Sequence, residues 1–439
     1  MALADTRSDR HILVLGATGL IGSAIIARLL ECGWPVTAAA RKDGPDVRKL
    51  QADSRILIDL NKITHVEDWE PHLREIHMVV NCAGVLQSGG RDSATAVHEK
   101  APELLFAACE RVGVRRVIHF SAMGADKGAL SDFSRTKASA EHALMASALD
   151  WVILRPSVVV GRAAVGGSAL FRGLAALPWE MPVQDAGRIA VVQLDDVVET
   201  VLHFVEDTGA ARIALDLAGP KPLRFEEVIA SYRRWLGWKP ARRIRLPALI
   251  MSLGYVLGDL AGQLGWRPPV RSTVRLEMAR GAVADPGRWT DATGIVPQSL
   301  EDALRGEPAS VQERWFARLF LLKPMIIVVF AFFWFLTGVV SLGPGYDIGV
   351  DMMLEGGAGP WSGPVVIAGG LADLIIGAAI LWRPTTRPAL WAALAVTLFY
   401  VLVGTAILPR LWDDPLGPMM KVWPILALNL VALAILDAR

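Results

Sequence analysis

The chain has 439 residues and a formal net charge of +1, so it is long enough for two or three domains and has no excess of cations for binding nucleic acid. Hydrophobic residues make up 53% of it, and its mean hydropathy of +0.38 is high for a soluble enzyme because apolar residues concentrate after Pro324. Three cysteines without ligand spacing exclude a disulfide framework, and the eight histidines predict no metal site.

The first predicted elements form a cradle for a phosphate group. A buried strand, Ile12–Leu15, is followed by three glycines at three-residue spacing and then by a helix over 23–30. Gly16 permits a tight turn, Gly19 lets backbone N–H groups approach a pyrophosphate, and Gly22 lets the helix pack on the strand. The start of a helix favours an anion, so we expect a dinucleotide to contact Gly16, Thr18, Gly19, Leu20, Ile21 and Gly22.

Strands and helices alternate after this cradle, which predicts an α/β fold with a doubly wound parallel sheet. The second predicted strand, Val36–Ala40, ends at Arg41 and Lys42, about twenty residues after the last motif glycine. Cations at this place suit the 2′-phosphate of NADP, whereas a carboxylate would suit the ribose of NAD. The sequence therefore favours NADP over NAD, and a solvated basic loop is the alternative.

The next two predicted strands place further candidate cofactor contacts at the same edge of the sheet. Arg55–Ile58 ends at Asp59, which either faces the adenine or caps the next turn. Met78–Val80 is followed by Asn81–Gly84 at the carboxyl end of the strand, where parallel sheets bind ligands. The candidate contacts here are Asp59, Asn81, Ala83 and Gly84.

Ser121 follows the fifth predicted strand, Val117–Phe120, and Lys137 follows Ser121 by sixteen residues. With the glycine motif and the segments Asn81–Gly84 and Trp151–Pro156, this pattern resembles the short-chain dehydrogenases/reductases. It is most similar to the atypical branch that includes the Rossmann accessory subunit of respiratory complex I. The resemblance covers about residues 10–305 and implies an NAD(P)-binding Rossmann domain.

The resemblance also implies a role for Pro156, whose backbone would run beside the nicotinamide of the cofactor. Arg155 next to it is either part of that contact or one half of a structural ion pair.

In that superfamily a tyrosine moves the proton, a lysine four residues later lowers the tyrosine pKa, and a serine steadies the substrate oxygen. The resemblance makes Lys137 and Ser121 the candidate catalytic residues, but Phe133 occupies the tyrosine position and cannot transfer a proton. Three hypotheses remain. In the first, Lys137 acts alone as acid or base. In the second, Lys137 and Ser121 only anchor a cofactor in a binding, sensing or assembly protein. In the third, Ser134 or a substrate hydroxyl relays the proton.

Residues 157–305 are predicted to form a small substrate lobe. Asp195 and Asp196 are expected to cap and charge the first turn of a helix, and a second helix is expected over Phe225–Leu236. A basic run over 233–245 is either a solvated face or a contact with anionic lipid. The apolar segment 246–266 predicts a cap helix or an interfacial helix, and not a membrane span.

The C-terminal part contains four apolar segments, at 325–342, 365–382, 389–408 and about 418–436. The first three are long enough to span a membrane, and the fourth is shorter and contains Lys421. Together they predict a four-helix transmembrane bundle that resembles the DoxX-like membrane family. The distribution of Lys and Arg places both termini in the cytoplasm, and Asp373 has either a ligand or proton role or an interhelical hydrogen bond.

The expected organisation is a flexible, polar N-terminus without a signal peptide (1–10), a Rossmann domain with its lobe (11–305), an approach helix (306–323) and a membrane domain (324–439). The expected function is an NADP-linked (or NAD-linked) oxidoreductase or isomerase of the inner (cytoplasmic) membrane, multi-pass and with its Rossmann domain in the cytoplasm. Its substrate would be lipophilic, such as a quinone or an isoprenoid. The alternative is a cofactor-binding scaffold, sensor or assembly factor for a membrane complex, and a regulated transporter is a weaker option.

Overall fold

The computed structural model describes residues 10–85, 93–125, 131–180, 186–206, 211–244, 247–415 and 417–437. The predicted flexible terminus, apart from Arg10, and Arg245 of the basic run lie outside these residues. The chain divides into two compact units. One comprises residues 1–259 and 268–317, and the other comprises residues 260–267 and 318–439.

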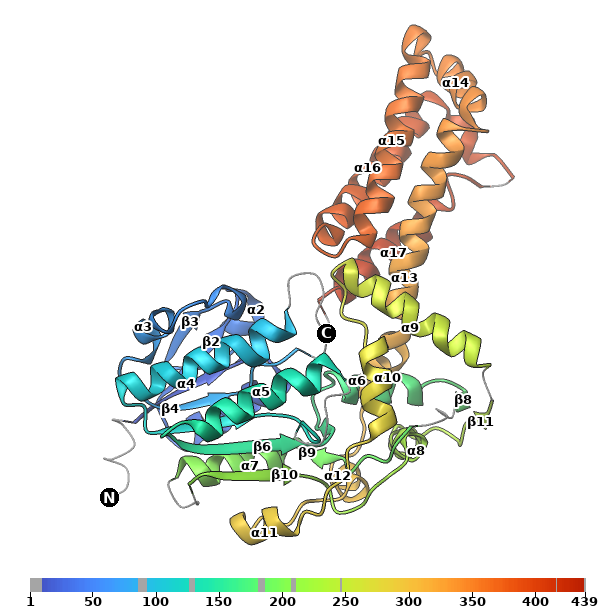
Figure 1. Ribbon diagram of the computed structural model, residues 1–439. Coiled ribbons are helices and arrows are strands. Elements are labelled where there is room, and N and C mark those ends of the chain that lie inside the picture. The colour runs from blue at the N-terminus through green and yellow to red at the C-terminus, as the bar shows by residue number, and fades with distance from the viewer. Residues whose placement is uncertain are drawn as a thin grey trace. The chain divides into compact units, whose positions relative to one another are not determined.

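The first unit is built on a seven-stranded sheet in which every pair of neighbouring strands is parallel (Figure 1). The chain reverses its direction of travel across the sheet between β1 and β4, and doubly wound folds bind ligands at such a point. The predicted α/β architecture is thereby confirmed. In sheet order the strands are β10 (Ile213–Leu217), β6 (Asp150–Pro156), β5 (Arg116–Phe120), β4 (Ile76–Asn81), β1 (His11–Leu15), β2 (Val36–Ala40) and β3 (Ser54–Leu57).

Alternate residues of the strands pack on opposite faces of the sheet, as the two-residue repeat of a strand requires. Ile12 and Val14 share a core with α1 (Leu20–Glu31) and α7 (Leu194–Val205). The intervening Leu13 and Leu15 share the other core with α4 (Ala101–Val112) and α5 (Asp132–Ala146). Two helical layers therefore cover the sheet. The short elements on this part of the chain are α2 (Pro45–Arg48), η1 (Leu60–Lys62), η2 (Val66–Asp68), α3 (Glu70–Leu73) and η3 (Ala96–Lys100).

The lobe beyond β6 contains short strands and helices. The expected helix over 225–236 is confirmed as α8, but α7 begins at Leu194 with Gln193 at its N-cap. The expected N-cap role of the aspartates is therefore wrong, and the Asp196 carboxylate accepts a hydrogen bond from the Gln298 amide. The elements are β7 (Val159–Val160), α6 (Gly167–Ala175), β8 (Trp179–Glu180), β9 (Val192–Gln193), α8 (Phe225–Trp235), β11 (Arg242–Arg243), α9 (Ala248–Gln263), α10 (Ser272–Arg280), α11 (Gly287–Thr293) and α12 (Leu300–Gly306).

Several members of the basic run have partners within this lobe, which argues against a continuous free cationic face. The guanidinium of Arg233 donates to the carbonyl oxygens of Ala175 and Leu177 at 2.7 and 2.5 Å. Arg234 pairs with Glu301 at 3.3 Å, and Arg243 pairs with Glu180 at 3.2 Å.

In the described residues, three helices are long and apolar enough to span a membrane: α13 (Val311–Leu342), α15 (Ser362–Leu381, preceded by a short turn) and α16 (Thr386–Ile407). The fourth expected span is wrong in length. It forms α17 (Val422–Ile435), whose 14 residues extend only about 21 Å against a hydrocarbon core of roughly 30 Å. The expected approach helix and first span form one helix, which contains Pro324.

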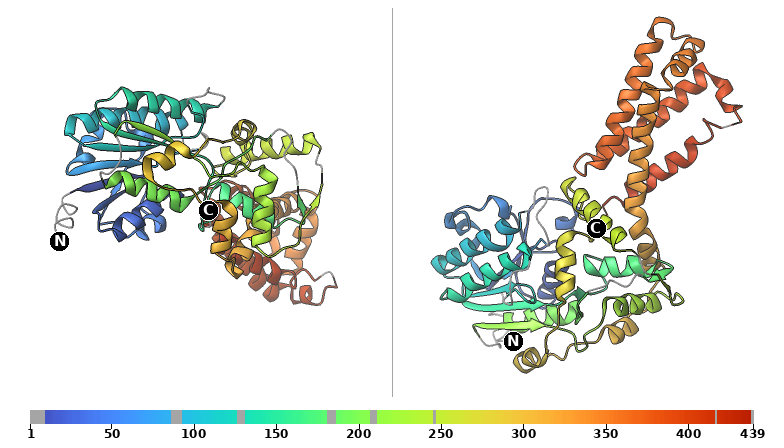
Figure 2. Two further views of the ribbon diagram at one scale, coloured as in Figure 1. Left: turned by 90° about the horizontal axis from the view of Figure 1, so that it is seen from below. Right: turned by 45° about the vertical axis from the view of Figure 1, so that its right-hand side comes forward.

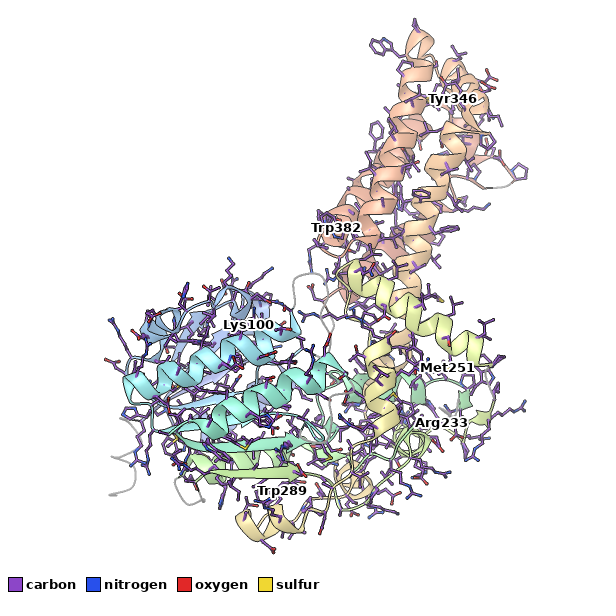
Figure 3. All side chains as sticks on the ribbon, in the orientation of Figure 1. Lys100, Arg233, Met251, Trp289, Tyr346 and Trp382 are labelled. Carbon is purple, nitrogen blue, oxygen red and sulfur yellow. The ribbon has the colours of Figure 1, made fainter. Side chains whose placement is uncertain are left out.

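The long helices of the second unit run side by side in both views (Figures 1 and 2). Tyr346, at the start of α14 (Tyr346–Glu355), and Trp382, after α15, lie near opposite ends of the bundle (Figure 3). Asp373 is buried between helices and accepts a hydrogen bond of 3.1 Å from the Tyr400 hydroxyl. Asn429, also buried, donates to the Leu390 carbonyl oxygen at 3.2 Å. Polar groups at this depth therefore face the bundle interior, as expected.

Candidate functional site

The turn after β1 has a shape that only glycine can take. Gly16 has a φ of +73°, and a Cβ atom built on it would lie 2.8 Å from the backbone carbonyl of Cys82. A Cβ atom at Gly22 would lie 2.4 Å from the Gly16 carbonyl oxygen. The turn is closed by a 2.9 Å hydrogen bond from the Gly19 amide to Gly16. A Cβ atom has no room at either position, so only glycine lets this loop pass so close to the neighbouring backbone.

The start of α1 supplies unpaired donors toward that turn. Gly19 is the N-cap, it provides no side-chain cap, and the first turn contains no acidic residue. The N–H groups of Leu20, Ile21 and Gly22 have no acceptor within the helix, because the first intrahelical bond runs from Ser23 to Gly19. Thr18 lies in the loop that leads to these donors. The cradle fits the pyrophosphate of a dinucleotide in shape and in electrostatic sign.

The loop after β4 is shaped by the side chain of Asn81. Its Oδ1 accepts a hydrogen bond of 3.1 Å from the Ala83 amide, and its Nδ2 donates to Nδ1 of His119 at 3.2 Å. Burial lowers the pKa of His119, so this ring is neutral. Asn81 therefore holds the Ala83–Gly84 backbone beside the glycine turn, and its own amide is already engaged.

Lys137 projects from α5 into the same place. Its buried ammonium donates to the carbonyl oxygen of Phe120 at 2.7 Å and to that of Ala83 at 3.3 Å. A Cβ atom built at Gly84 would lie 3.7 Å from Nζ, an ordinary van der Waals distance, so this loop lies directly beside the ammonium. Burial lowers the pKa of Lys137 to about 8, although the neighbouring Cys82 and Glu141 raise it. The lysine is therefore poised to exchange a proton near neutral pH.

His98 belongs to the same cluster and was missed by the sequence analysis. Its Nε2 accepts from the Val85 amide at 2.9 Å, and its Nδ1 contacts Thr136 Oγ1 at 3.1 Å. The ring of Phe133 packs edge-on against it, with centroids 5.5 Å apart. Burial, reinforced by the Lys137 charge, lowers the pKa of His98 to about 2, so this ring too is neutral. His98 lies in the five-residue π-turn η3, which is visible only in the structure, so no signal in the sequence pointed to it.

Ser121 directly follows β5, and its buried hydroxyl has no hydrogen-bond partner in the described part of the chain. Its amide donates to Leu154, so the backbone is satisfied while the side chain is not. A buried hydroxyl without a partner is unfavourable, and a bound ligand could supply the missing partner.

A second missed cluster reaches the site from α10. Glu277 Oε1 accepts hydrogen bonds from Ser131 at 2.5 Å and from Ser134 at 3.0 Å. Arg280 donates to Ser134 Oγ at 2.7 Å and to the Met123 carbonyl oxygen at 2.8 Å, and it pairs with Glu277 at 2.6 Å. The Ser134 hydroxyl is therefore already hydrogen-bonded to two residues of α10.

The remaining candidates lie at the rim of the site. Asp59 caps η1 by accepting from the amide of Asn61 at 3.2 Å, which is one of its two predicted roles. Burial opposes its charge, but hydrogen bonds from Asn61 and the nearby Arg41 cation lower the pKa of Asp59. Arg41 is half-buried at the end of β2, and Lys42 after it is exposed.

Pro156 ends β6 beside Leu217 of β10. Arg155 forms the predicted structural ion pair, with two hydrogen bonds of 2.9 and 2.5 Å to the buried Glu141 carboxylate. No disulfide joins the three cysteines, which all lie in the part of the chain that the structure describes. No group of three potential metal ligands occurs among the residues that the structure describes.

Comparisons with known proteins agree with this geometry. A model of the NAD(P)H-binding family matches residues 16–196, and a model of the DoxX-like family matches residues 331–430. Sterol demethylase protein B of Methylococcus capsulatus is 30% identical over 342 residues, which cover 69% of this chain and 98% of that protein. Ceramide reductase of Caulobacter vibrioides is 20% identical over 54% of this chain and 73% of its own length. Alpha subcomplex subunit 9 of mitochondrial NADH dehydrogenase from Arabidopsis thaliana is 25% identical over 49% of this chain and 55% of its own length.

Solved structures share the fold of the first unit. MoeE5 in complex with UDP-glucuronic acid and NAD aligns with a TM-score of 0.51 at 20% identity, over 67% of this chain and 96% of its own. UDP-glucose 4-epimerase of Thermotoga maritima aligns with a TM-score of 0.52 at 17% identity over the same shares. The glycine cradle, the matched models and the near-complete alignment with a 30% identical relative show that this chain belongs to the NAD(P)H-binding, atypical short-chain dehydrogenases/reductases and carries a DoxX-like membrane domain.

Proposed function

We propose that this protein is a membrane-tethered, NAD(P)-dependent oxidoreductase that acts on a lipophilic substrate and uses Lys137 to handle the proton. One observation carries the proposal: the buried ammonium of Lys137 binds the Ala83 carbonyl oxygen, and Ala83 follows the Cys82 backbone against which Gly16 packs. The group with a lowered pKa and the cofactor cradle therefore share one short loop. A group with a lowered pKa next to a cofactor-binding loop is typical of catalytic sites.

The chain supplies positioning and proton transfer, and the nicotinamide supplies the hydride when it is bound. The fit rests on the N–H groups of Leu20, Ile21 and Gly22, which have no acceptor within the helix, and on the buried Ser121 hydroxyl, which has no partner in the described part of the chain. In a reduction, Lys137 would donate a proton from Nζ to the substrate oxygen that becomes a hydroxyl, and would regain one from solvent. Ser121 would donate a hydrogen bond to the same oxygen. Phe133 would exclude water from the site without taking part in the proton transfer.

Two observations support a lipophilic substrate. The second unit contains three apolar helices suited to a bilayer, which would hold the enzyme where such substrates dissolve. Relatives include a ceramide reductase, a sterol demethylase protein and a divinyl chlorophyllide reductase, all named for lipophilic compounds. By analogy we place the substrate oxygen on a membrane lipid or pigment-like molecule. A quinone or an isoprenoid meets the same description.

The cofactor preference and the location are further parts of the proposal. Half-buried Arg41 at the end of β2 favours NADP. Arg383 lies between α15 and α16, Arg387 lies in the first turn of α16, and the segment 343–363 has no Lys or Arg, so we place both termini in the cytoplasm and the protein in the inner membrane. We retain 11–305 and 324–439 as the boundaries of the catalytic and membrane domains.

A second candidate is favoured by one specific observation. Lys137 donates to two carbonyl oxygens, and the tyrosine position is occupied by Phe133, an arrangement that also suits passive anchoring of a cofactor. The matched relatives include subunits of NADH dehydrogenase from Arabidopsis thaliana and Mus musculus. The protein would then be a cofactor-binding scaffold or assembly factor of a membrane complex.

The experiment uses the full chain in lipid nanodiscs, with NADPH and NADH binding measured by fluorescence and oxidation followed against ketosteroids, ceramide precursors and short-chain quinones. The enzyme hypothesis expects turnover in the wild type, and loss of about 10²-fold or more in Lys137→Ala while NADPH still binds. The matched pair Phe133→Tyr and Phe133→Leu separates the alternatives. Binding without turnover in the wild type, with turnover gained only in Phe133→Tyr, would establish the scaffold and refute the enzyme.

A further inference from the structure

Helix α9 (Ala248–Gln263) carries a stripe of exposed apolar side chains. Five large residues, each between 51% and 80% exposed, repeat at spacings of four, three, one and three: Leu249, Leu253, Val256, Leu257 and Leu260. These spacings place all five on one face of a helix. Figure 3 shows the side chains along this helix, where Met251 is labelled. Five exposed large apolar residues in a row mark an interaction surface and not a chance surface leucine.

The opposite face of α9 is already packed. A Cβ atom built at Gly258 would lie 1.8 Å from the Val270 carbonyl oxygen, so the helix backbone meets the following segment there. The only charged residue in the helix, Asp259, accepts a hydrogen bond from the Ser272 hydroxyl and pairs with Arg271 at 3.4 Å. The helix therefore has one polar, occupied face and one apolar face without charge.

The end of α9 is fixed at one end of the membrane helices. Leu264, the residue after α9, accepts a hydrogen bond of 3.0 Å from the Arg383 amide. The Trp266 indole donates to the Leu381 carbonyl oxygen at 2.7 Å, and the Arg383 guanidinium lies 5.3 Å from the centre of its ring. Leu381 is the last residue of α15, so the chain leaves α9 at the level where a membrane-spanning helix ends. Tryptophan and arginine are the residues that favour this interfacial level.

The length of α9 decides between crossing the bilayer and lying on it. Sixteen residues extend about 24 Å, which is less than the roughly 30 Å hydrocarbon core. A helix of this length with one apolar face and one polar face is stable in the plane of the interface, with the apolar face toward the acyl chains.

We propose that α9 is an in-plane membrane anchor whose stripe inserts into the boundary between headgroups and acyl chains of a lipid bilayer. The proposal rests on the membrane location assigned above and not on catalysis. In the chain, α9 is followed within ten residues by α10, whose Glu277 and Arg280 contact the candidate site.

The test is spin labelling of the full chain in nanodiscs. A nitroxide on Leu253→Cys is compared with one on Leu57→Cys, a residue of β3 that is 54% exposed against 55% for Leu253. Wild-type protein carried through the same labelling gives the background from the three native cysteines. Collision rates with oxygen, which enters the acyl region, and with a water-soluble nickel chelate are measured at both sites.

The proposal expects oxygen collisions to exceed nickel collisions at Leu253→Cys, and the reverse at Leu57→Cys. Equal access of nickel to the two sites would overturn it, because the stripe would then face water. Low access of both reagents at Leu253→Cys would also overturn it, because protein and not lipid would cover the stripe. Neither result depends on whether NADPH is oxidised, so failure of the anchor and failure of the proposed enzyme remain distinguishable.

Discussion

Ser134 donates a hydrogen bond of 3.0 Å to Glu277, although 143 residues separate them in sequence. The same hydroxyl accepts a hydrogen bond from Arg280, which also holds the Met123 carbonyl oxygen. Helix α10 is thus tied to the first turn of α5 and to the loop after β5, the two segments that carry Lys137 and Ser121.

Replacement of Arg280 should loosen this connection. Arg280→Met removes two hydrogen bonds and leaves the partly buried Glu277 carboxylate without its ion-pair partner, at a cost of about 1–3 kcal/mol. We expect backbone amides in the first turn of α5 to exchange with deuterium at least about 5-fold faster. Arg275→Met, on the same helix but exposed, is the control and should leave that exchange unchanged. Equal exchange in both variants would show that α10 does not stabilise α5.

Features of the fold that depend on neighbouring residues could be predicted from the sequence, whereas contacts between distant segments could not. The five predicted strands, from 12–15 to 117–120, lie within about two residues of β1 to β5, because buried apolar runs are local signals. The glycine turn was predictable because its constraints are also local. Glu277, Arg280 and His98 were missed because only the tertiary fold brings them to the site, and no spacing in the sequence marks such contacts. The N-cap at Asp195 failed because Gln193 ends β9 directly before the helix begins.

The proton-transfer role of Lys137 predicts a specific pH dependence. Burial lowers the pKa of Lys137 to about 8, so the ammonium that donates the proton predominates below this pH and the neutral amine above it. For reduction, kcat/KM should therefore be constant at low pH and fall tenfold per pH unit above about 8. Steady-state rates between pH 6 and 10 with saturating NADPH check this. A profile that is flat through pH 8 would refute Lys137 as the acid.

The glycine cradle predicts a contrast between two glycines of similar backbone conformation. Gly16 and Gly33 have φ angles of +73° and +78°, so alanine strains the backbone at both, by about 1–2 kcal/mol. Only at Gly16 would the new methyl group meet the Cys82 backbone, whereas nothing lies within 4 Å at Gly33. We expect Gly16→Ala to weaken NADPH binding at least about 10-fold and Gly33→Ala to leave the Kd unchanged. Equal losses would show that folding strain alone, and not the cradle, sets affinity.

Arg41 should decide the preference between the two nicotinamide cofactors. A guanidinium at the end of β2 can bind the 2′-phosphate of NADPH, and a charged hydrogen bond of this kind contributes about 1.5–3 kcal/mol. Arg41→Ala should raise the Kd for NADPH about 10-fold or more and leave the Kd for NADH nearly unchanged. Arg48→Ala removes an arginine that pairs with Asp43 in the same region and serves as the control. Parallel loss of affinity for both cofactors in Arg41→Ala would contradict the assignment.

The ion pair between Arg155 and Glu141 links stability to the pH dependence of Lys137. Glu141 is buried and accepts two hydrogen bonds from Arg155, so Glu141→Gln leaves a poorly paired guanidinium and should cost about 3 kcal/mol. Glu199→Gln, which breaks the exposed pair with Arg28, should cost much less stability, and thermal unfolding in detergent compares the two.

The Glu141 carboxylate also raises the pKa of Lys137, so its neutralisation favours the uncharged amine. The fall in reductase activity should consequently begin at a lower pH in Glu141→Gln than in the wild type, provided that the variant is assayed below its melting temperature. Glu199→Gln should keep the wild-type profile, since Glu199 is not among the groups that shift the pKa of Lys137. An unshifted fall in Glu141→Gln would mean that the titrating group observed in the assay is not Lys137.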